Sequence, residues 1–157
     1  MLYFIIINPT TTVTLTLIAD NNNLLHIDFG SQRPANAIEQ TTPVLALAAQ
    51  QLGEYFHGLR RDFTIPLKAN GTQFQQQVWQ ALTHIPYGMT HTYKELAETI
   101  GNPKASRAVG SACNRNPLPI VIPCHRVIGS SGSLTGYAGG LELKAMLLKM
   151  EEKFTKN

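Results

Sequence analysis

The chain has 157 residues, of which 43% are hydrophobic and 15% charged, with a formal net charge of +3 at pH 7. Its length suffices for one domain or two small ones, and its modest positive charge allows a nucleic-acid partner without requiring one. The longest apolar run at the N-terminus, residues 2–7, is far shorter than the roughly 20 residues that span a bilayer, and it has no basic leader or small-residue cleavage site. We therefore expect an unprocessed cytoplasmic protein without a membrane partner.

Apolar and polar residues alternate over residues 12–18 and 24–29, with a polar turn cluster between them. This pattern predicts an antiparallel hairpin. The spacing over residues 38–56 predicts a helix that admits Pro43 near its start and ends at Gly58.

A short strand is predicted over residues 62–67, followed by a polar break at 68–71. We place a domain boundary at this break, which gives an N-terminal domain of residues 1–70 and a second domain of residues 71–157. The second domain is predicted to open with an amphipathic helix from Thr72 that ends before Pro86.

Two short helices are predicted next, over residues 92–100 and 104–113, with Gly101 at the stop position of the first and Asn102 as the cap of the second. Helix, glycine turn and helix form the helix-turn-helix pattern. Because short helical hairpins are common, two packed helices without a ligand remain the alternative at this point.

The β-branched run at residues 120–122 predicts a brief buried strand that stops at Pro123. A loop rich in glycine and serine follows over residues 129–140. Residues 141–152 are predicted to close the chain as an amphipathic helix.

The two cysteines, Cys113 and Cys124, are too few for a disulfide framework. Cys124 follows the predicted strand and precedes His125 and Arg126, a setting in which a thiolate could be stabilised. Cysteine is the side chain best suited to attack a carbon electrophile. Zinc ligation by Cys113, Cys124 and His125 would lack a fourth ligand, so we expect no metal and interpret Cys113 as a core residue.

The hexapeptide Ile-Pro-Cys-His-Arg-Val at residues 122–127 resembles the active-site signature of the O6-alkylguanine-DNA alkyltransferases. The similarity extends through residues 93–97, 101–110, 116–117 and 136–141, and so covers essentially the whole second domain. The first domain is similar mainly in its size, hairpin and position. The resemblance implies an α+β fold, in which a ribonuclease-H-like α/β domain precedes a mostly helical, winged helix-turn-helix-like catalytic domain.

The same resemblance implies that the protein acts in direct-reversal DNA repair. Cys124 would take a methyl or alkyl group irreversibly from the flipped base, His125 would act as its base through a water, and Glu151 would orient the histidine. Because a thioether is inert, each molecule would act once and without a cofactor.

For delivery of the base, the resemblance implies that Tyr93 helps to rotate the nucleotide and donates a proton, and that Arg107 fills the space the base leaves. The small Ala108 would let its helix lie deep in the minor groove. Phosphate contacts are expected from Lys104, Arg115 or Arg126.

The pocket for the base is expected to include Val127, through its backbone carbonyl, together with Tyr137, Ala138 and Gly139 of the glycine-rich loop. Asn116 matches the asparagine of the turn that ties the recognition helix to the active site, where its side chain satisfies backbone groups.

The expected partner is double-stranded DNA that contains O6-alkylguanine, with O4-alkylthymine as a second candidate lesion and the protein acting as a monomer. Two other functions remain as alternatives: a non-catalytic sensor of alkylation damage, against which Cys124 argues, and a Cys-His hydrolase, which would turn over repeatedly. The preference among alkyl groups is left open.

Overall fold

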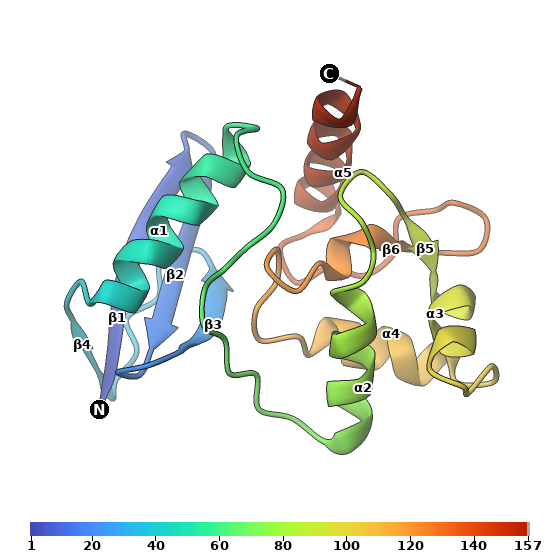
Figure 1. Ribbon diagram of the computed structural model, residues 1–157, viewed down its shortest axis with the longest axis horizontal. Helices are drawn as coiled ribbons and strands as arrows, with labels where there is room; N and C mark the ends of the chain where they lie inside the picture. Colours follow the sequence, from blue (N-terminus) through green and yellow to red (C-terminus); the bar gives the residue numbers. More distant parts are fainter. Residues whose placement is uncertain (157) are drawn as a thin grey trace. The chain divides into compact units, whose positions relative to one another are not determined.

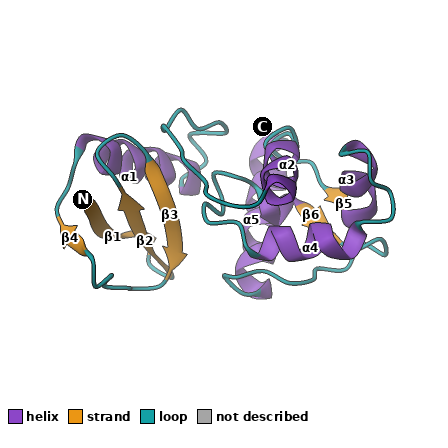
Figure 2. Cartoon of the chain, turned by 90° about the horizontal axis from the view of Figure 1, so that it is seen from below, coloured by secondary structure: helices purple, strands orange, loops and turns teal. Residues whose placement is uncertain are grey.

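The computed structural model describes residues 1–156, which divide into an N-terminal unit, Met1–Asn70, and a C-terminal unit that begins at Gly71 (Figure 1). The N-terminal unit is a four-stranded sheet in the order β3-β2-β1-β4, with one helix packed on it (Figure 2). Its elements are β1 (Leu2–Thr10), β2 (Val13–Ala19), β3 (Leu24–Phe29), β4 (Ala37–Glu39) and α1 (Pro43–Phe56). Strands β1, β2 and β3 pair antiparallel, which confirms the predicted hairpin, and β4 pairs parallel with β1.

The predicted helix over residues 38–56 is wrong at its start, because α1 begins only at Pro43. Ile38 instead pairs with Tyr3 in the parallel β1–β4 ladder. Thr42 caps the helix by accepting a hydrogen bond from the Leu45 N–H, and proline at the first helical position needs no partner for its missing donor.

The predicted strand over residues 62–67 is also wrong, since the structure has only an isolated bridge there, between Leu24 and Leu67. The buried Gln51 side chain holds this segment instead. Its amide donates to the Thr64 hydroxyl at 2.6 Å, and its carbonyl oxygen accepts from the Thr64 N–H at 2.9 Å. A side chain of α1 therefore fixes the middle of this segment, while its end makes two backbone hydrogen bonds with Leu24 of β3.

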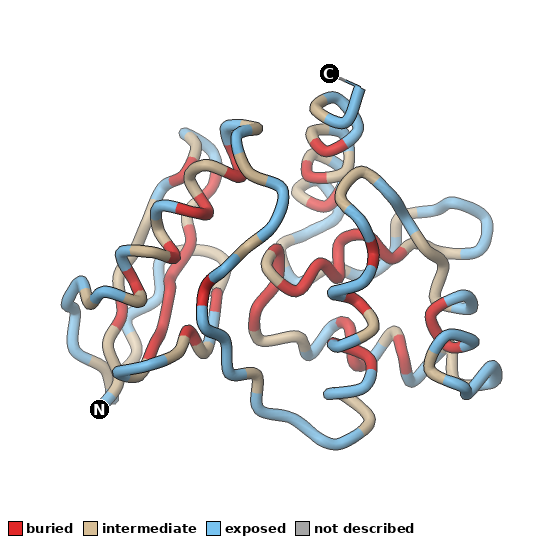
Figure 3. The backbone as a smooth tube through the Cα atoms, viewed as in Figure 1, coloured by how far each residue is buried: buried red, intermediate tan, exposed pale blue. Residues whose placement is uncertain are grey.

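The C-terminal unit is mostly helical, and its buried residues gather between α2, α4 and the turn that follows α4 (Figure 3). Its elements are α2 (Gln73–Leu82), β5 (His91–Thr92), α3 (Tyr93–Thr99), α4 (Ser106–Asn114), the 3-10 turn η1 (Cys124–Arg126), β6 (Val127–Ile128) and α5 (Leu141–Thr155). Strands β5 and β6 form a short parallel pair. None of the helices in the described part of the chain has the length and apolar character needed to cross a membrane.

Helices α3 and α4 confirm the predicted pair of short helices, with Gly101 at the stop position in the left-handed region. The predicted cap at Asn102 is wrong. Helix α4 begins at Ser106 with Ala105 at its N-cap position, and the Asn102 carbonyl accepts from the Ala105 N–H in the preceding turn. Trp79 of α2 fixes the second helix by donating from its indole nitrogen to the Ala112 carbonyl at 2.9 Å.

The predicted strand at residues 120–122 is a turn, in which Ile120 has a φ of +75° while its side chain is buried. Asn116 holds this turn from inside. Its amide nitrogen donates to the Ile122 carbonyl at 2.8 Å, and its oxygen accepts from the Leu118 N–H at 2.9 Å. The left-handed conformation, costly for a β-branched residue, is thereby imposed by its surroundings at the entrance to η1.

Candidate active site

Cys124 is the first residue of η1, and only 6% of its surface is exposed. The Cys124 backbone N–H donates to the Ile122 carbonyl, which also accepts a hydrogen bond from the Asn116 side chain. The Asn116 turn therefore fixes the position of the thiol.

The resting state of Cys124 differs from the thiolate that the sequence suggested. Burial raises the pKa of the Cys124 thiol to about 11, and the Asn116 side chain and the charge of Lys144 oppose this rise only in part. At neutral pH the side chain is therefore a protonated thiol. It needs a base to become a nucleophile.

His125, the residue expected to act as that base, follows Cys124 in η1. Its ring is fully buried, and its Nε2 lies 2.6 Å from Oε2 of Glu151 on α5. Burial lowers the pKa of His125, so the imidazole is neutral. With Glu151 accepting at Nε2, Nδ1 is the nitrogen that would take up a proton.

Arg126 is buried rather than available to DNA, so its expected phosphate contact is wrong. Its Nε donates to Oε1 of Glu151 at 2.9 Å and its Nη2 to Oε2 at 3.1 Å. The hydrogen bond with His125, followed by those with Arg126, holds the pKa of Glu151 at about 2 despite its burial. The structure places Glu151 against His125, and the ion pair between Glu151 and Arg126 is a feature that the sequence analysis missed.

Acid should weaken the fold through Glu151. Because its folded pKa lies near 2, below the ordinary value of 4.5, the unfolded chain binds the proton more tightly between these values. The stabilisation is complete above pH 4.5 and falls as the pH drops towards 2. Chemical denaturation at several pH values should show that the stability difference between the wild type and Glu151→Gln shrinks across this window, and a constant difference would contradict the shift.

A cavity of about 410 Å³ brings together the two residues assigned to delivery of the base, Tyr93 and Arg107. It is lined by α3, α4 and the glycine-rich loop, with Tyr93, Lys94, Ser106, Arg107, Gly110, Asn114, Gly129, Ser130, Thr135 and Gly136 on its walls. Arg107, Ala108 and Lys104 are exposed to solvent. Burial raises the pKa of the half-buried Tyr93 phenol, which therefore keeps its proton.

Lys144 of α5 is a member of the site that the sequence analysis missed. It is fully buried, its Nζ donates to the Thr135 carbonyl at 2.9 Å, and it lies 5.9 Å from the centre of the Tyr93 ring. Tyr93 donates to the same carbonyl at 3.2 Å. The signal was present in the sequence, because Lys144, Leu147 and Glu151 share one helical face.

The remaining predicted pocket residues lie in the segments that follow Cys124. Val127 is buried in β6, where it pairs with His91. In the loop over residues 129–140, Ala138 is exposed and Gly139 half-buried. Burial raises the pKa of Tyr137 well above its ordinary value, so its phenol is neutral.

Gly88 packs the turn after α2 against α5. Its φ is +81°, a Cβ there would overlap the Thr155 side chain, and its N–H donates to Oε1 of Glu151 at 3.2 Å. Gly101 is a matched control, since its φ is +79° and a Cβ there meets no described atom within 4 Å.

Gly88→Ala should therefore destabilise the fold more than Gly101→Ala. Left-handed backbone costs alanine about 1–2 kcal/mol at either position. The overlap with Thr155 should add about 1–3 kcal/mol at Gly88 alone. Urea unfolding followed by circular dichroism measures both variants, and equal losses would contradict the close packing.

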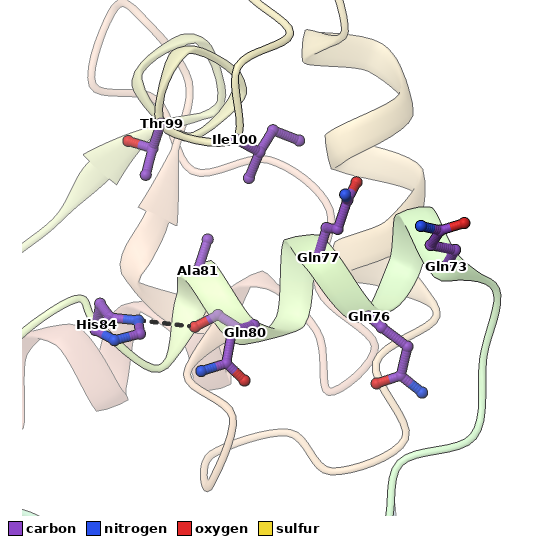
Figure 4. A pocket seen from close by; sticks show the side chains of 8 residues that line it. All are labelled: Gln73, Gln76, Gln77, Gln80, Ala81, His84, Thr99 and Ile100. Carbon is purple, nitrogen blue, oxygen red and sulfur yellow. Dashed lines mark hydrogen bonds between the residues drawn. The ribbon is translucent and has the colours of Figure 1, made fainter.

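A second cavity, of about 570 Å³, lies along α2 and the end of α3. Figure 4 shows its side chains, half of which are carboxamides: Gln73, Gln76, Gln77, Gln80, Ala81, His84, Thr99 and Ile100. It contains none of the predicted site residues. Among the described residues, no three His, Cys, Asp or Glu side chains gather into a metal-binding group.

Comparison with known proteins agrees with this arrangement in both units. Residues 12–69 match the ribonuclease-like domain of 6-O-methylguanine DNA methyltransferase, and residues 73–153 match its DNA-binding domain. The chain belongs to the 6-O-methylguanine DNA methyltransferase family. Like that family, it is a DNA-repair methyltransferase that reverses damage directly by moving an alkyl group to a cysteine.

Relatives of the 6-O-methylguanine DNA methyltransferase family match over nearly the whole chain. The methylated-DNA--protein-cysteine methyltransferase of Methanosarcina barkeri is 51% identical over 97% of this chain and 98% of its own length. The O6-methylguanine methyltransferase of Mycobacterium tuberculosis has the same fold, with a TM-score of 0.88 and 40% identity over 98% of this chain and 94% of that one. A structure of M. tuberculosis OGT in complex with DNA gives a TM-score of 0.87 and 41% identity over 98% of this chain and 93% of that one. The expected α+β fold is confirmed.

Proposed function

We propose that Cys124 is the cysteine that accepts the alkyl group, and that the substrate is O6-alkylguanine in double-stranded DNA. His125 removes the thiol proton through a water, and the sulfur attacks the alkyl carbon. The bond between that carbon and guanine O6 breaks, and Tyr93 protonates the leaving guanine. The products are an S-alkylcysteine and unmodified guanine.

The observation that carries this proposal is the buried set formed by Cys124, His125 and Glu151. A nucleophile, a neutral base and an ionised carboxylate that orients the base are what alkyl transfer to sulfur requires. Tyr93 and Arg107, which line one cavity, provide a route for the base. Chemistry on a paired base requires its extrusion from the duplex.

The proposed DNA-binding surface lies on α4 and the turn before it. Arg107 occupies the stack after the base leaves, Ala108 lets α4 approach the groove closely, and Lys104 contacts a phosphate. All three are exposed. Because phosphate contacts release counterions, Lys104 contributes to the salt dependence of binding.

The base pocket of the proposal is built from the segments after Cys124. The Val127 carbonyl reads the guanine amino group, Tyr137 packs on the base, and Ala138 and Gly139 form the rim near O6. Asn116 keeps the turn that carries the thiol in place, which its two hydrogen bonds support. The protein acts as a monomer, without a cofactor, and once per molecule.

Mass spectrometry of the intact protein tests the proposal. After incubation with a duplex that contains one O6-methylguanine, the protein should gain one methyl group, mapped by peptide analysis to Cys124. With excess substrate, each molecule should accept a single methyl group. Binding without any mass gain would indicate a damage sensor, and repeated turnover would indicate a hydrolase; either result would overturn the assignment.

Arg107→Ala should slow methyl transfer from duplex DNA by about 10- to 100-fold, because extrusion of a base costs a few kcal/mol that the arginine offsets by stacking. The loss should be smaller on single-stranded DNA, where less stacking is broken. Single-turnover rates on both substrates give the measurement. Arg33→Ala, an exposed arginine of the N-terminal unit, is the control, and equal losses on the two substrates would argue against the role in extrusion.

A further inference from the structure

The Glu151 carboxylate accepts hydrogen bonds from three different residues. His125 Nε2 lies 2.6 Å from Oε2, and the Gly88 N–H donates to Oε1 at 3.2 Å. Arg126 reaches both oxygens, with Nε 2.9 Å from Oε1 and Nη2 3.1 Å from Oε2. Bidentate contact of this kind fixes the plane of a carboxylate as well as its position.

Arg126 is itself held in place. Its remaining terminal nitrogen, Nη1, donates to the Ile85 carbonyl at 2.7 Å, and the guanidinium lies 5.6 Å from the centre of the Tyr87 ring. The side chain is 7% exposed. The turn after α2 therefore anchors Arg126, and Arg126 anchors Glu151.

We propose that Arg126 is a positioning residue for alkyl transfer, which holds the Glu151 carboxylate in register with His125 and balances its charge so that His125 stays neutral. This inference rests on the proposed function, in which His125 is the base. A lysine at this position would retain the charge but lose the bidentate geometry, whereas a glutamine would lose both.

The charged groups around His125 explain why the charge of Glu151 must be balanced for the imidazole to stay neutral. Glu151 and Lys144 act on it from α5 and Arg126 from η1, in which Cys124 is the preceding residue. Helix α2 carries no titratable side chain between its ends. Tyr137, of the loop before α5, is a neutral phenol. Burial lowers the pKa of His125, Glu151 raises it, and the positive charges of Arg126 and Lys144 lower it again.

Removal of the Arg126 charge should therefore raise the pKa of His125. The imidazole would then hold a proton at a pH where the wild type does not, and a protonated imidazole cannot accept the thiol proton. Lys144 and burial remain in the variant, so the rise should be partial.

The first experiment measures the single-turnover rate of methyl transfer against pH for the wild type, Arg126→Gln and Arg126→Lys. For Arg126→Gln, we expect the rate at pH 7 to be at least about tenfold lower than that of the wild type. The acid limb of its pH–rate profile should move upward by about one pH unit. For Arg126→Lys, the limb should stay in place while the rate falls about tenfold, because only the geometry is lost. A wild-type rate for Arg126→Lys, or an unmoved limb for Arg126→Gln, would overturn the proposal.

The second experiment follows the ring nitrogens of His125 by ¹⁵N NMR over the same pH range. The wild type should show a neutral ring protonated at Nε2, and the pKa should rise in Arg126→Gln but not in Arg126→Lys. Because this titration requires no DNA, it tests the charge balance even if Cys124 accepts no methyl group. If Arg126→Gln does not fold, Arg126→Lys still tests the proposal. The proposal is supported if the rate of methyl transfer falls while the pKa and tautomer of His125 match those of the wild type. An altered pKa of His125 in Arg126→Lys overturns it.

Discussion

Cys124→Ala should abolish methyl transfer while leaving the affinity for lesion-containing duplex DNA unchanged. The substitution removes a single sulfur from a residue that is 6% exposed, and the exposed residues Arg107 and Lys104 lie elsewhere, on α4 and in the turn before it. Intact mass after incubation with methylated DNA measures transfer, and gel-shift titration measures binding.

Cys113→Ala is the matched control for this experiment. Cys113 is also buried, and burial raises the pKa of its thiol to about 12. It lies on the inner side of α4, so the variant should accept a methyl group at close to the wild-type rate. A methyl group found on Cys113 in the Cys124→Ala protein would contradict the assignment of the nucleophile.

Glu151→Gln should slow methyl transfer by about 10²- to 10⁴-fold, the range expected when an acid–base residue loses its function. The change keeps the size of the side chain but removes the charge that pairs with Arg126 and replaces one of the two acceptor oxygens with an NH2 donor. An amide could rotate its nitrogen towards His125 and favour the wrong tautomer. Rapid-quench measurement under single-turnover conditions gives the rate.

The neighbouring residue offers a control on the same helix. Glu152 is exposed and pairs only weakly, at 3.2 Å, with the exposed Lys156. Glu152→Gln should therefore react at the wild-type rate. If Glu151→Gln reacted within threefold of Glu152→Gln, the orienting role of Glu151 would be refuted.

The parts of the fold that sequence predicted well are those set by local spacing and caps. The hairpin formed by β2 and β3, the stop at Gly101 and the start of α2 after Thr72 all depend on neighbouring residues. The parallel strand β4 was missed because its pairing with β1 joins distant segments. The strand over residues 2–10 pairs with the adjacent β2, but its continuous apolar run over residues 2–7 lacks the alternation that predicts a strand. Periodicity could not reveal that Ile38 belongs to a sheet.

The turn before Cys124 shows a different limit. Ile120 belongs to a β-branched run that favours a strand, yet it has a φ of +75° within a turn that the Asn116 side chain bridges from Leu118 to Ile122. The roles of His125 and Glu151 were inferred from a resemblance, and their contact required the structure. Arg126 could not be placed by sequence, because an arginine beside a cysteine suits phosphate binding as well as a buried ion pair.

Under the proposed function, in which each molecule reacts once at Cys124, the burial of this residue has a further consequence. Any peroxide, soluble alkylating agent or disulfide that reached a thiolate would consume the molecule without repairing anything. A recessed sulfur with a pKa of about 11 is a poor target for such reagents, whose reactions require the anion. Selectivity for the lesion would then begin in the resting protein, in which the buried sulfur stays a protonated thiol.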